Sequence, residues 1–297
     1  MKASVVVPTL RPGPLLVELL CRLADELPPE SELILVRSGV ASDVPVPAPV
    51  DAALSAVRAR TKIVCVPTLG LANARQAGLE ASGDIALYID DDCLPEPGWY
   101  AGLREAMRDG AAAAGGAIVV DWAGGLAPTW LPASMRSLYG ERSAGPEARH
   151  RPFGANMALR RDPAMRAGGF RRDLGAVGDV PLMHEETELC ERIAGAGGRV
   201  VEATRAVVHH QVRADQVRRA WIVRRSWHEG RSDARRDGVR RGRRAAQRVA
   251  KLVALVAVWP LALRPRARVY ATARIAHHFG YLTETMLRRG SGTRARG

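Results

Sequence analysis

The 297-residue sequence has the composition of an ordinary globular protein, with 47% hydrophobic and 25% charged residues. This balance excludes a wholly disordered chain, a collagen-like chain and a small disulfide-rich fold. The net charge of +13 is spread unevenly, because residues 1–212 carry 22 basic and 26 acidic side chains while residues 213–297 carry 22 basic and 5 acidic ones. We therefore predict a near-neutral body over residues 1–212 and a basic tail over residues 213–297. Such a tail suits an anionic surface, either a membrane or a nucleic acid.

Cysteine spacing and hydropathy indicate the compartment. The four cysteines are far apart in the sequence and show no metal-binding spacing, which favours a reducing environment. The N-terminus enters an apolar run directly, without the regions of a signal peptide. The longest apolar stretch, residues 252–263, contains Pro260 and falls short of the roughly 20 residues that a membrane-spanning helix needs. We expect a cytoplasmic protein whose tail can lie peripherally on the inner face of a membrane.

Strand and helix patterns alternate over the first part of the chain. Short apolar or β-branched runs predict strands at residues 4–8, 32–36, 62–66 and 85–89, and helical spacing predicts helices at 14–26 and 71–81. The Pro-rich segment at residues 45–49 is interpreted as a loop. Strands this apolar are typical of a parallel sheet covered by helices on both faces, so we predict an α/β fold with a mostly parallel, Rossmann-like sheet.

The patterns become less regular after residue 97. They predict a helix at 98–108, a strand at 117–121, a loop-rich stretch to residue 151, strands at 153–161, 199–201 and 206–209, and a helix at 185–194. Thirteen arginines then lie between Arg213 and Arg248. Trp221, Ile222 and Trp227 interrupt them, which favours amphipathic helices over a disordered polybasic tail.

Three consecutive aspartates, Asp90, Asp91 and Asp92, directly follow the predicted strand at 85–89. In an open α/β sheet, ligands bind outside the carboxyl ends of the strands. Carboxylates crowded at that edge repel one another unless a cation lies among them, and Mg²⁺ or Mn²⁺ takes carboxylate oxygens together with substrate phosphates. The alternative is a solvated acidic turn that caps a helix.

At this point the sequence resembles the family 2 glycosyltransferases, which have the GT-A fold. Residues 5–9 (VVVPT) look like the opening strand of that family, and residues 70–78 (GLANARQAG) with 83–84 and 90–92 are similar to its central helix and D-x-D metal motif. The acceptor half is matched in order by residues 154–161, 168–170, 185–189 and His209. The resemblance covers residues 3–210 and implies a GT-A domain at 1–212 followed by the basic helical tail.

The resemblance implies inverting transfer of a sugar from a nucleotide-diphosphate donor to an acceptor hydroxyl, with Mn²⁺ or Mg²⁺ as cofactor. The acceptor is left open between a glycan, a lipid-linked molecule and a small molecule. Matching residues one by one predicts a metal site at Asp92 and His209, although either histidine of the pair 209–210 could face it. The donor-binding set is predicted to be Pro8, Thr9, Arg11, Arg75, Asp90 and Asp91.

The sequence departs from the family at two places. An acid usually ends the second strand and reads the base, whereas here Val36 is followed by Arg37, so the nucleobase is left open. The catalytic acids are commonly Glu-Asp, whereas this chain has Glu185-Glu186. Glu186 shares the apolar helical stripe of Leu189 and Ile193, so we predict that Glu186 is the general base and that Glu185 lies on the polar side.

Two other classes of function compete with this interpretation. A nucleic-acid-binding protein would use the arginine-rich tail, and its affinity would fall steeply with salt. The tail matches none of the usual nucleic-acid-binding modules, however, so we expect no nucleic-acid partner. A nucleotidyltransferase with the same fold would release pyrophosphate where a glycosyltransferase releases a nucleoside diphosphate.

Overall fold

The computed structural model describes residues 1–297 except 58, 144–151, 239–240 and 294–297. Contacts divide the chain into two compact units, and neither unit is one continuous stretch. Unit 1 comprises Met1–Asp121, Gly140–Arg172 and Glu185–Gln211, and unit 2 comprises Trp122–Tyr139, Asp173–His184 and Val212–Gly297. The chain enters unit 2 for the last time at Val212, next to the domain boundary predicted from charge.

Unit 1 is built on a mixed eight-stranded sheet with the strand order β3-β2-β1-β4-β7-β6-β8-β5. Strands β3, β2, β1 and β4 are parallel, whereas β7 pairs antiparallel with both β4 and β6, and β5 pairs antiparallel with β8. The predicted α/β class is confirmed. The strands are β1 (Ala3–Thr9), β2 (Glu32–Ser38), β3 (Arg60–Val66), β4 (Ile85–Ile89), β5 (Cys93–Pro95), β6 (Ala113–Trp122), β7 (Asn156–Arg160) and β8 (Val200–Val212).

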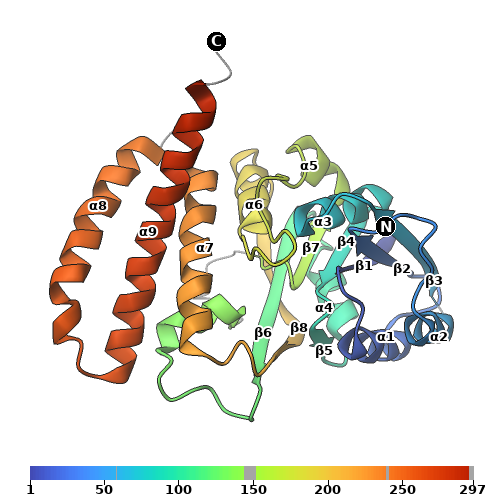
Figure 1. Cartoon of the computed structure of the whole chain (residues 1–297). Helices are drawn as coiled ribbons and strands as arrows, with labels where there is room; N and C mark the ends of the chain where they lie inside the picture. The colour runs from blue at the N-terminus through green and yellow to red at the C-terminus, as the bar shows by residue number, and fades with distance from the viewer. Residues whose placement is uncertain (58, 144–151, 239–240, 294–297) are drawn as a thin grey trace. The chain divides into compact units, whose positions relative to one another are not determined.

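Helices cover both faces of the parallel strands, so β1, β2 and β4 are buried throughout. Alternate residues of each strand point to opposite faces. Val5 and Leu87 therefore join one core with α1 (Pro14–Glu26), α2 (Ala48–Ala56) and α4 (Trp99–Ala106). Val6 and Tyr88 join the other core with α3 (Leu71–Ala81), α5 (Arg161–Arg166) and α6 (Glu185–Gly195). Figure 1 shows α1 and α2 below the parallel strands and α3 above them.

Several segments differ from the sequence prediction. The short elements β5 and α5 were not predicted, and two other segments were assigned differently. The Pro-rich loop expected at residues 45–49 contains the start of α2, because a proline in the first turn of a helix has no hydrogen bond to lose there. The two short strands expected at 199–201 and 206–209 are one continuous strand, β8. Thr204 and Arg205 in its middle are exposed, so their polar side chains break the apolar pattern without ending the strand.

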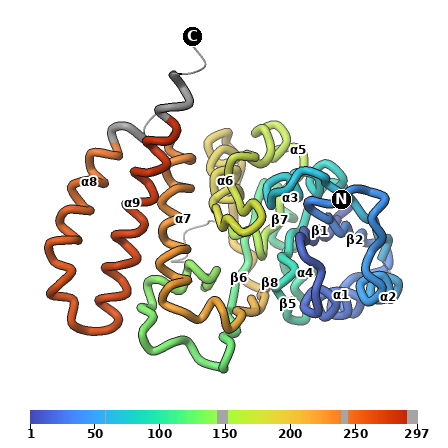
Figure 2. The backbone as a smooth tube through the Cα atoms, in the orientation of Figure 1, coloured from blue at the N-terminus to red at the C-terminus, as the bar shows by residue number. Residues whose placement is uncertain are grey.

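Unit 2 is dominated by three helices, as the amphipathic pattern of the tail predicts. They are α7 (Arg219–Asp237), α8 (Arg241–Val258) and α9 (Pro265–Thr293), and the short 3₁₀ helices η1 (Ala133–Tyr139) and η3 (Trp259–Leu261) belong to the same unit. Figure 2 shows α9 between α7 and α8. Glycines allow the close packing of α7 and α9, since a Cβ at Gly230 would overlap the backbone at His277, and one at Gly280 would overlap that at Trp227.

Several arginines of the tail are used inside this packing. Glu284 of α9 is buried and accepts hydrogen bonds from Arg231, at 2.9 Å, and Arg235, at 2.7 Å, both on α7. Asp233 of α7 is paired with His277 and Arg248, each at 3.2 Å. Burial alone would raise the pKa of Asp233, but these partners lower it to about 2. No described helix is long and apolar enough to cross a membrane.

Candidate active site

A buried arginine joins the two acidic motifs that the sequence singles out. Arg75 lies on α3 with 2% of its surface exposed. One guanidinium nitrogen donates to Asp90 Oδ1 at 2.7 Å, and the other donates to Glu185 Oε1. Asp90 follows β4 and Glu185 begins α6, so this one side chain brings the aspartate triplet and the acid pair together within unit 1.

A glycine makes room for the guanidinium. A Cβ at Gly154 would overlap Cζ and both terminal nitrogens of Arg75. Gly154 lies in the turn before β7, and it is the first residue of the segment 154–161 that resembles the family. The glycine is therefore required by the arginine that packs on it.

Arg75 was predicted to lie along the donor, but its contacts in the structure are with acids of this chain. Both ends of its guanidinium face carboxylates of this chain, and burial leaves little of it for a ligand. Burial alone would lower the pKa of Arg75, but the negative charges of Asp90 and Glu185 raise it. Arg75 therefore holds the carboxylates of Asp90 and Glu185 in position through these two ion pairs.

The two acids of α6 are both buried, with 2% of Glu185 and 6% of Glu186 exposed. The prediction that Glu185 lies on the polar side of the helix was wrong, because its ion pair with Arg75 overrides the helical pattern. Glu186 shares the buried stripe of α6 with Leu189 and Ile193, as predicted.

The pKa of Glu186 is raised from 4.5 to about 8 by burial and by the charge of Glu185 next to it. The attraction of Arg75 offsets only part of this rise. A carboxyl with a pKa near the working pH is suited to accepting a proton, which favours Glu186 over Glu185 as a base.

The aspartate triplet lies just after β4, and its three side chains have different partners. Asp90 binds Arg75, and Asp91 Oδ2 accepts a hydrogen bond of 2.5 Å from Thr9 Oγ1 at the end of β1. Burial and the charge of Asp92 raise the pKa of Asp91 to about 7. Asp92 Oδ2 lies 3.3 Å from His210 Nε2. The structure thus brings Thr9 of the predicted donor-binding set against the triplet.

The strand β8 selects between the two adjacent histidines. Successive side chains of a strand point to opposite faces. His209 has its ring nitrogens 3.1 Å from Asp121 Oδ1 and 2.8 Å from Glu96 Oε1, and these two partners outweigh its burial and raise its pKa. His210, and not His209, faces Asp92. The predicted choice of His209 is therefore replaced by His210, one residue along the strand.

Asp92 and His210 are suited to hold part of a divalent ion's coordination shell. Their donor atoms lie 3.3 Å apart, and both side chains are partly exposed, at 30% and 18%. Among the described residues, no group of three or more His, Cys, Asp or Glu side chains could hold a metal alone. Mg²⁺ commonly takes one or two protein carboxylates and substrate phosphate oxygens.

The remaining predicted donor contacts lie around the end of β1. Pro8 is buried in the strand, and Arg11 is exposed in the loop that follows. Arg37 lies one residue before the end of the neighbouring strand β2, near the position where the family usually has an acid. Its guanidinium donates to the carbonyl oxygens of Val44, at 2.6 Å, and Pro45, at 3.0 Å. Arg37 therefore holds a loop and does not replace the missing acid.

Other residues of the family-like segments have structural roles. Asn156 Oδ1 accepts a hydrogen bond of 2.9 Å from Trp99 Nε1, and its amide nitrogen donates to the carbonyl oxygens of Ala117 and Ala206. Trp99 is fully buried, so it belongs to the core and cannot stack on a sugar. Gln76 accepts a hydrogen bond of 2.9 Å from the backbone nitrogen of Phe170.

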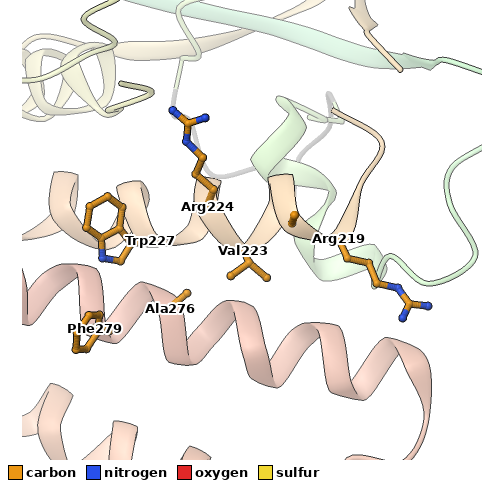
Figure 3. A pocket seen from close by; sticks show the side chains of 7 residues that line it. Arg219, Val223, Arg224, Trp227, Ala276 and Phe279 are labelled. Carbon is orange, nitrogen blue, oxygen red and sulfur yellow. The ribbon is translucent and has the colours of Figure 1, made fainter. Parts of the chain in front are cut away.

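Unit 2 has a separate, shallow pocket of about 520 Å³ between α7 and α9. Figure 3 shows Val223 and Trp227 of α7 on one side and Ala276 and Phe279 of α9 on the other. The lining is apolar except for Arg219 and Arg224, whose guanidinium groups extend away from the pocket in this view. It contains no carboxylate and none of the predicted site residues, so it is not a candidate for the catalytic centre.

Comparison with known proteins identifies the family. The family model described as "Glycosyl transferase family 2" matches residues 4–167, which is more than half of the chain. The matched segment contains the aspartate triplet, Arg75 and Gly154. The chain therefore belongs to glycosyl transferase family 2, and the resemblance inferred from the sequence is confirmed.

Two curated relatives support this assignment. The glucosyl-dolichyl phosphate glucuronosyltransferase of Haloferax volcanii is 32% identical over 171 residues, which are 55% of this chain and 54% of the relative. The succinoglycan biosynthesis protein ExoM of Rhizobium meliloti is 29% identical over 178 residues, which are 57% of this chain and 53% of the relative. The chain thus matches these relatives over about half of their length.

Solved structures confirm the GT-A fold. The mannosyltransferase PcManGT from Pyrobaculum calidifontis, in complex with GDP-Man and Mn²⁺, has a TM-score of 0.63 at 20% identity, covering 97% of this chain and 87% of that one. GalNAc-T7 with UDP, GalNAc and Mn²⁺ has a TM-score of 0.54 at 17% identity, covering 78% of this chain and 50% of that one.

Proposed function

We propose that this chain is a metal-dependent, inverting glycosyltransferase that moves a sugar from a nucleotide-diphosphate donor to an acceptor hydroxyl. The observation that carries the proposal is the pair of contacts that Arg75 makes to Asp90 and Glu185. These contacts bring the aspartate triplet next to the acid pair, where Glu186 is buried and has a raised pKa, and this supports a proposed metal and diphosphate site beside the proposed base. Family membership supports the same reaction class.

In the proposed reaction, Glu186 takes the proton of the acceptor hydroxyl. The acceptor oxygen forms a bond to the anomeric carbon of the sugar as the bond from that carbon to the diphosphate oxygen breaks. The bonding electrons leave with the diphosphate, and inversion follows from attack on the opposite face. Arg75 orients Glu185 and Asp90 through its two ion pairs. Thr9 orients Asp91 through a hydrogen bond of 2.5 Å.

Asp92 and His210 are proposed to hold Mn²⁺ or Mg²⁺. When bound, the ion neutralises the negative charge that develops on the leaving diphosphate. Two of the solved structures with this fold contain Mn²⁺ together with a nucleotide or nucleotide sugar, which supports a divalent ion here. Pro8, Thr9 and Arg11 are proposed to lie near the nucleotide.

The acceptor class stays open, and a lipid-linked acceptor has specific support. The relative from Haloferax volcanii has glucosyl-dolichyl phosphate in its name. A lipid-linked substrate is met at a membrane surface, and the basic tail, with a charge of +17 over residues 213–297, suits peripheral binding to an anionic membrane. We therefore include peripheral membrane association in the proposed function.

A donor screen tests the reaction class. The purified full chain is incubated with UDP-sugars, GDP-sugars and dTDP-sugars, with Mn²⁺ or Mg²⁺, and both nucleoside diphosphate release and thermal stability are measured. A true donor should stabilise the fold by about 2.7 kcal/mol at a hundredfold excess over Kd. A parallel incubation supplies nucleoside triphosphates and sugar 1-phosphates. Pyrophosphate release there, with no nucleoside diphosphate formed from any nucleotide sugar, would identify a nucleotidyltransferase and overturn the proposal.

A further inference from the structure

Helix α8 exposes an apolar face over its C-terminal half. Val249, Val253 and Val256 have 46%, 64% and 53% of their surfaces exposed. Their spacing of four and three residues puts them on one face of the helix. Leu261 and Leu263 follow in η3 and the turn after it, with 78% and 84% exposed. We name these five residues the α8 surface.

The rest of unit 2 does not cover the α8 surface in the described part of the chain. Helix α8 packs chiefly on α9, and Leu252 and Leu255 are its less exposed leucines. The alanines between the exposed valines are exposed as well: Ala246, Ala250, Ala254 and Ala257. An unbroken apolar helix face in water is unusual for a monomer and marks an interaction surface.

Charge identifies the kind of partner. Between Asp237 and Glu284 the sequence has ten Lys and Arg residues and no Asp or Glu. Lys251 is two residues from both Val249 and Val253, so it lies on the other side of α8. Arg264 and Arg266 follow Leu263 and are exposed, so positive charges border the C-terminal end of the α8 surface. Trp259 at the end of α8 is 37% exposed, and an aromatic residue in that position is typical of the membrane–water interface.

Four of the six arginines of α7 have partners inside unit 2. Arg231 and Arg235 both form ion pairs with the buried Glu284. Arg224 and Arg225 donate to the backbone carbonyls of Asp179 and Pro181. The basic residues that border the α8 surface are therefore the ones placed to meet an anionic partner.

We propose that the α8 surface docks on an anionic lipid bilayer, with α8 lying in the plane of the membrane. The exposed valines and leucines enter the boundary between headgroups and acyl chains, and Arg264 and Arg266 contact lipid phosphates. A second copy of this chain fits less well, because a symmetric contact would place two basic segments against each other. The inference deepens the membrane association included in the proposed function.

Vesicle co-sedimentation of the full chain tests this docking. Vesicles of phosphatidylcholine alone are compared with vesicles containing about a third phosphatidylglycerol, and binding is expected only to the latter. The double variant Val253→Asp/Val256→Asp should bind at least tenfold more weakly. The matched control is Val44→Asp in unit 1, because Val44 is 45% exposed and lies outside the tail. This control should bind like the parent.

A charge variant separates the electrostatic contribution. Each basic residue near an anionic surface contributes about 1 kcal/mol, which is about a fivefold change in affinity. Arg264→Ser/Arg266→Ser should therefore weaken binding by about 25-fold at low salt and by less at high salt. Circular dichroism checks that α8 stays folded in every variant.

Three results would overturn the docking proposal. They are equal binding to both vesicle types, absence of binding to either, and unchanged binding of the Val253→Asp/Val256→Asp variant. If sedimentation without lipid shows a dimer that this variant dissociates, the surface joins two copies instead. Nucleoside diphosphate release from a soluble donor should be unchanged in the variant, so failure of the docking and failure of the proposed reaction are distinguishable.

Discussion

Replacing Glu186 by Gln should make the protein more stable while it abolishes turnover. The folded protein holds the Glu186 proton up to a pKa of about 8, whereas the unfolded chain releases it above the ordinary value of 4.5. Unfolding therefore releases a proton between these values, and the free energy of unfolding falls as the pH rises through that window. At about 1.4 kcal/mol per pKa unit, this destabilisation is on the order of 3 kcal/mol at pH 7.

The gain in the free energy of unfolding from Glu186→Gln should develop over the same pH range, from 4.5 to about 8. It should be small near pH 4.5, increase with pH and become constant above about 8, where both states of the parent are ionised. Loss of the base should lower kcat on the order of 10²–10⁴-fold while donor binding persists. In the parent, kcat/KM should rise with pH up to about 8, since only the ionised carboxylate accepts a proton.

Glu185→Gln is the matched control, and its stability effect has the opposite sign. It removes one of the two carboxylates that face the buried Arg75. Breaking a buried ion pair typically costs about 3–5 kcal/mol, and Asp90, which remains, should reduce that cost. Urea denaturation of both variants at pH 5, 7 and 8.5, with initial rates at each pH, measures these effects. If Glu186→Gln gains no stability between pH 5 and 8, or turns over normally, the assignment of the base is wrong.

Three further predictions concern the metal site and the packing around the acids. Asp92→Ala should abolish turnover and weaken donor binding only when metal is present, and undiminished activity in EDTA would contradict a metal requirement. His210→Gln should raise the concentration of Mn²⁺ needed for half-maximal activity by about tenfold or more, whereas His209→Gln should leave it nearly unchanged. Gly154→Ala should cost about 1–3 kcal/mol of stability and most of the activity, because its Cβ overlaps the buried guanidinium, while Gly13→Ala, with no atom nearer than 3.8 Å, should cost little of either.

The helices and strands that the sequence predicts best are those whose apolar spacing results from burial alone. Helices α1 and α3 and strand β4 have the predicted bounds, because burial alone sets their apolar spacing. Helix α2 was missed because prolines usually end helices, and here they lie in the first turn, where a helix tolerates them. Strand β8 was divided in two because its exposed residues are polar.

Side-chain partners are harder to predict than elements. Alternation along a strand shows that the side chains at 209 and 210 face opposite ways, but not which one faces the aspartates. The pairing of β5 with β8 decides this, since it sets Cys93 opposite His210. Glu185 was placed on the wrong side of α6 because its partner, Arg75, is 110 residues away in the sequence. The family-like segment 154–161 shows that a glycine stands at position 154. The reason for it, the packing of the Arg75 guanidinium, is visible only in the structure.

The position of Arg75 shows how two adjacent glutamates acquire different chemistry. They are neighbours of the same residue type, and both are buried at the start of α6. Arg75 binds one of them directly, so the charge of Glu185 is held in place, and that fixed charge is what helps burial to raise the pKa of Glu186 to about 8. The same arginine binds Asp90, so a change at either acid motif also changes the electrostatics of the other. The proposed base and the proposed metal site should therefore both respond to substitution of Arg75, which removes the attraction that limits the rise in the pKa of Glu186.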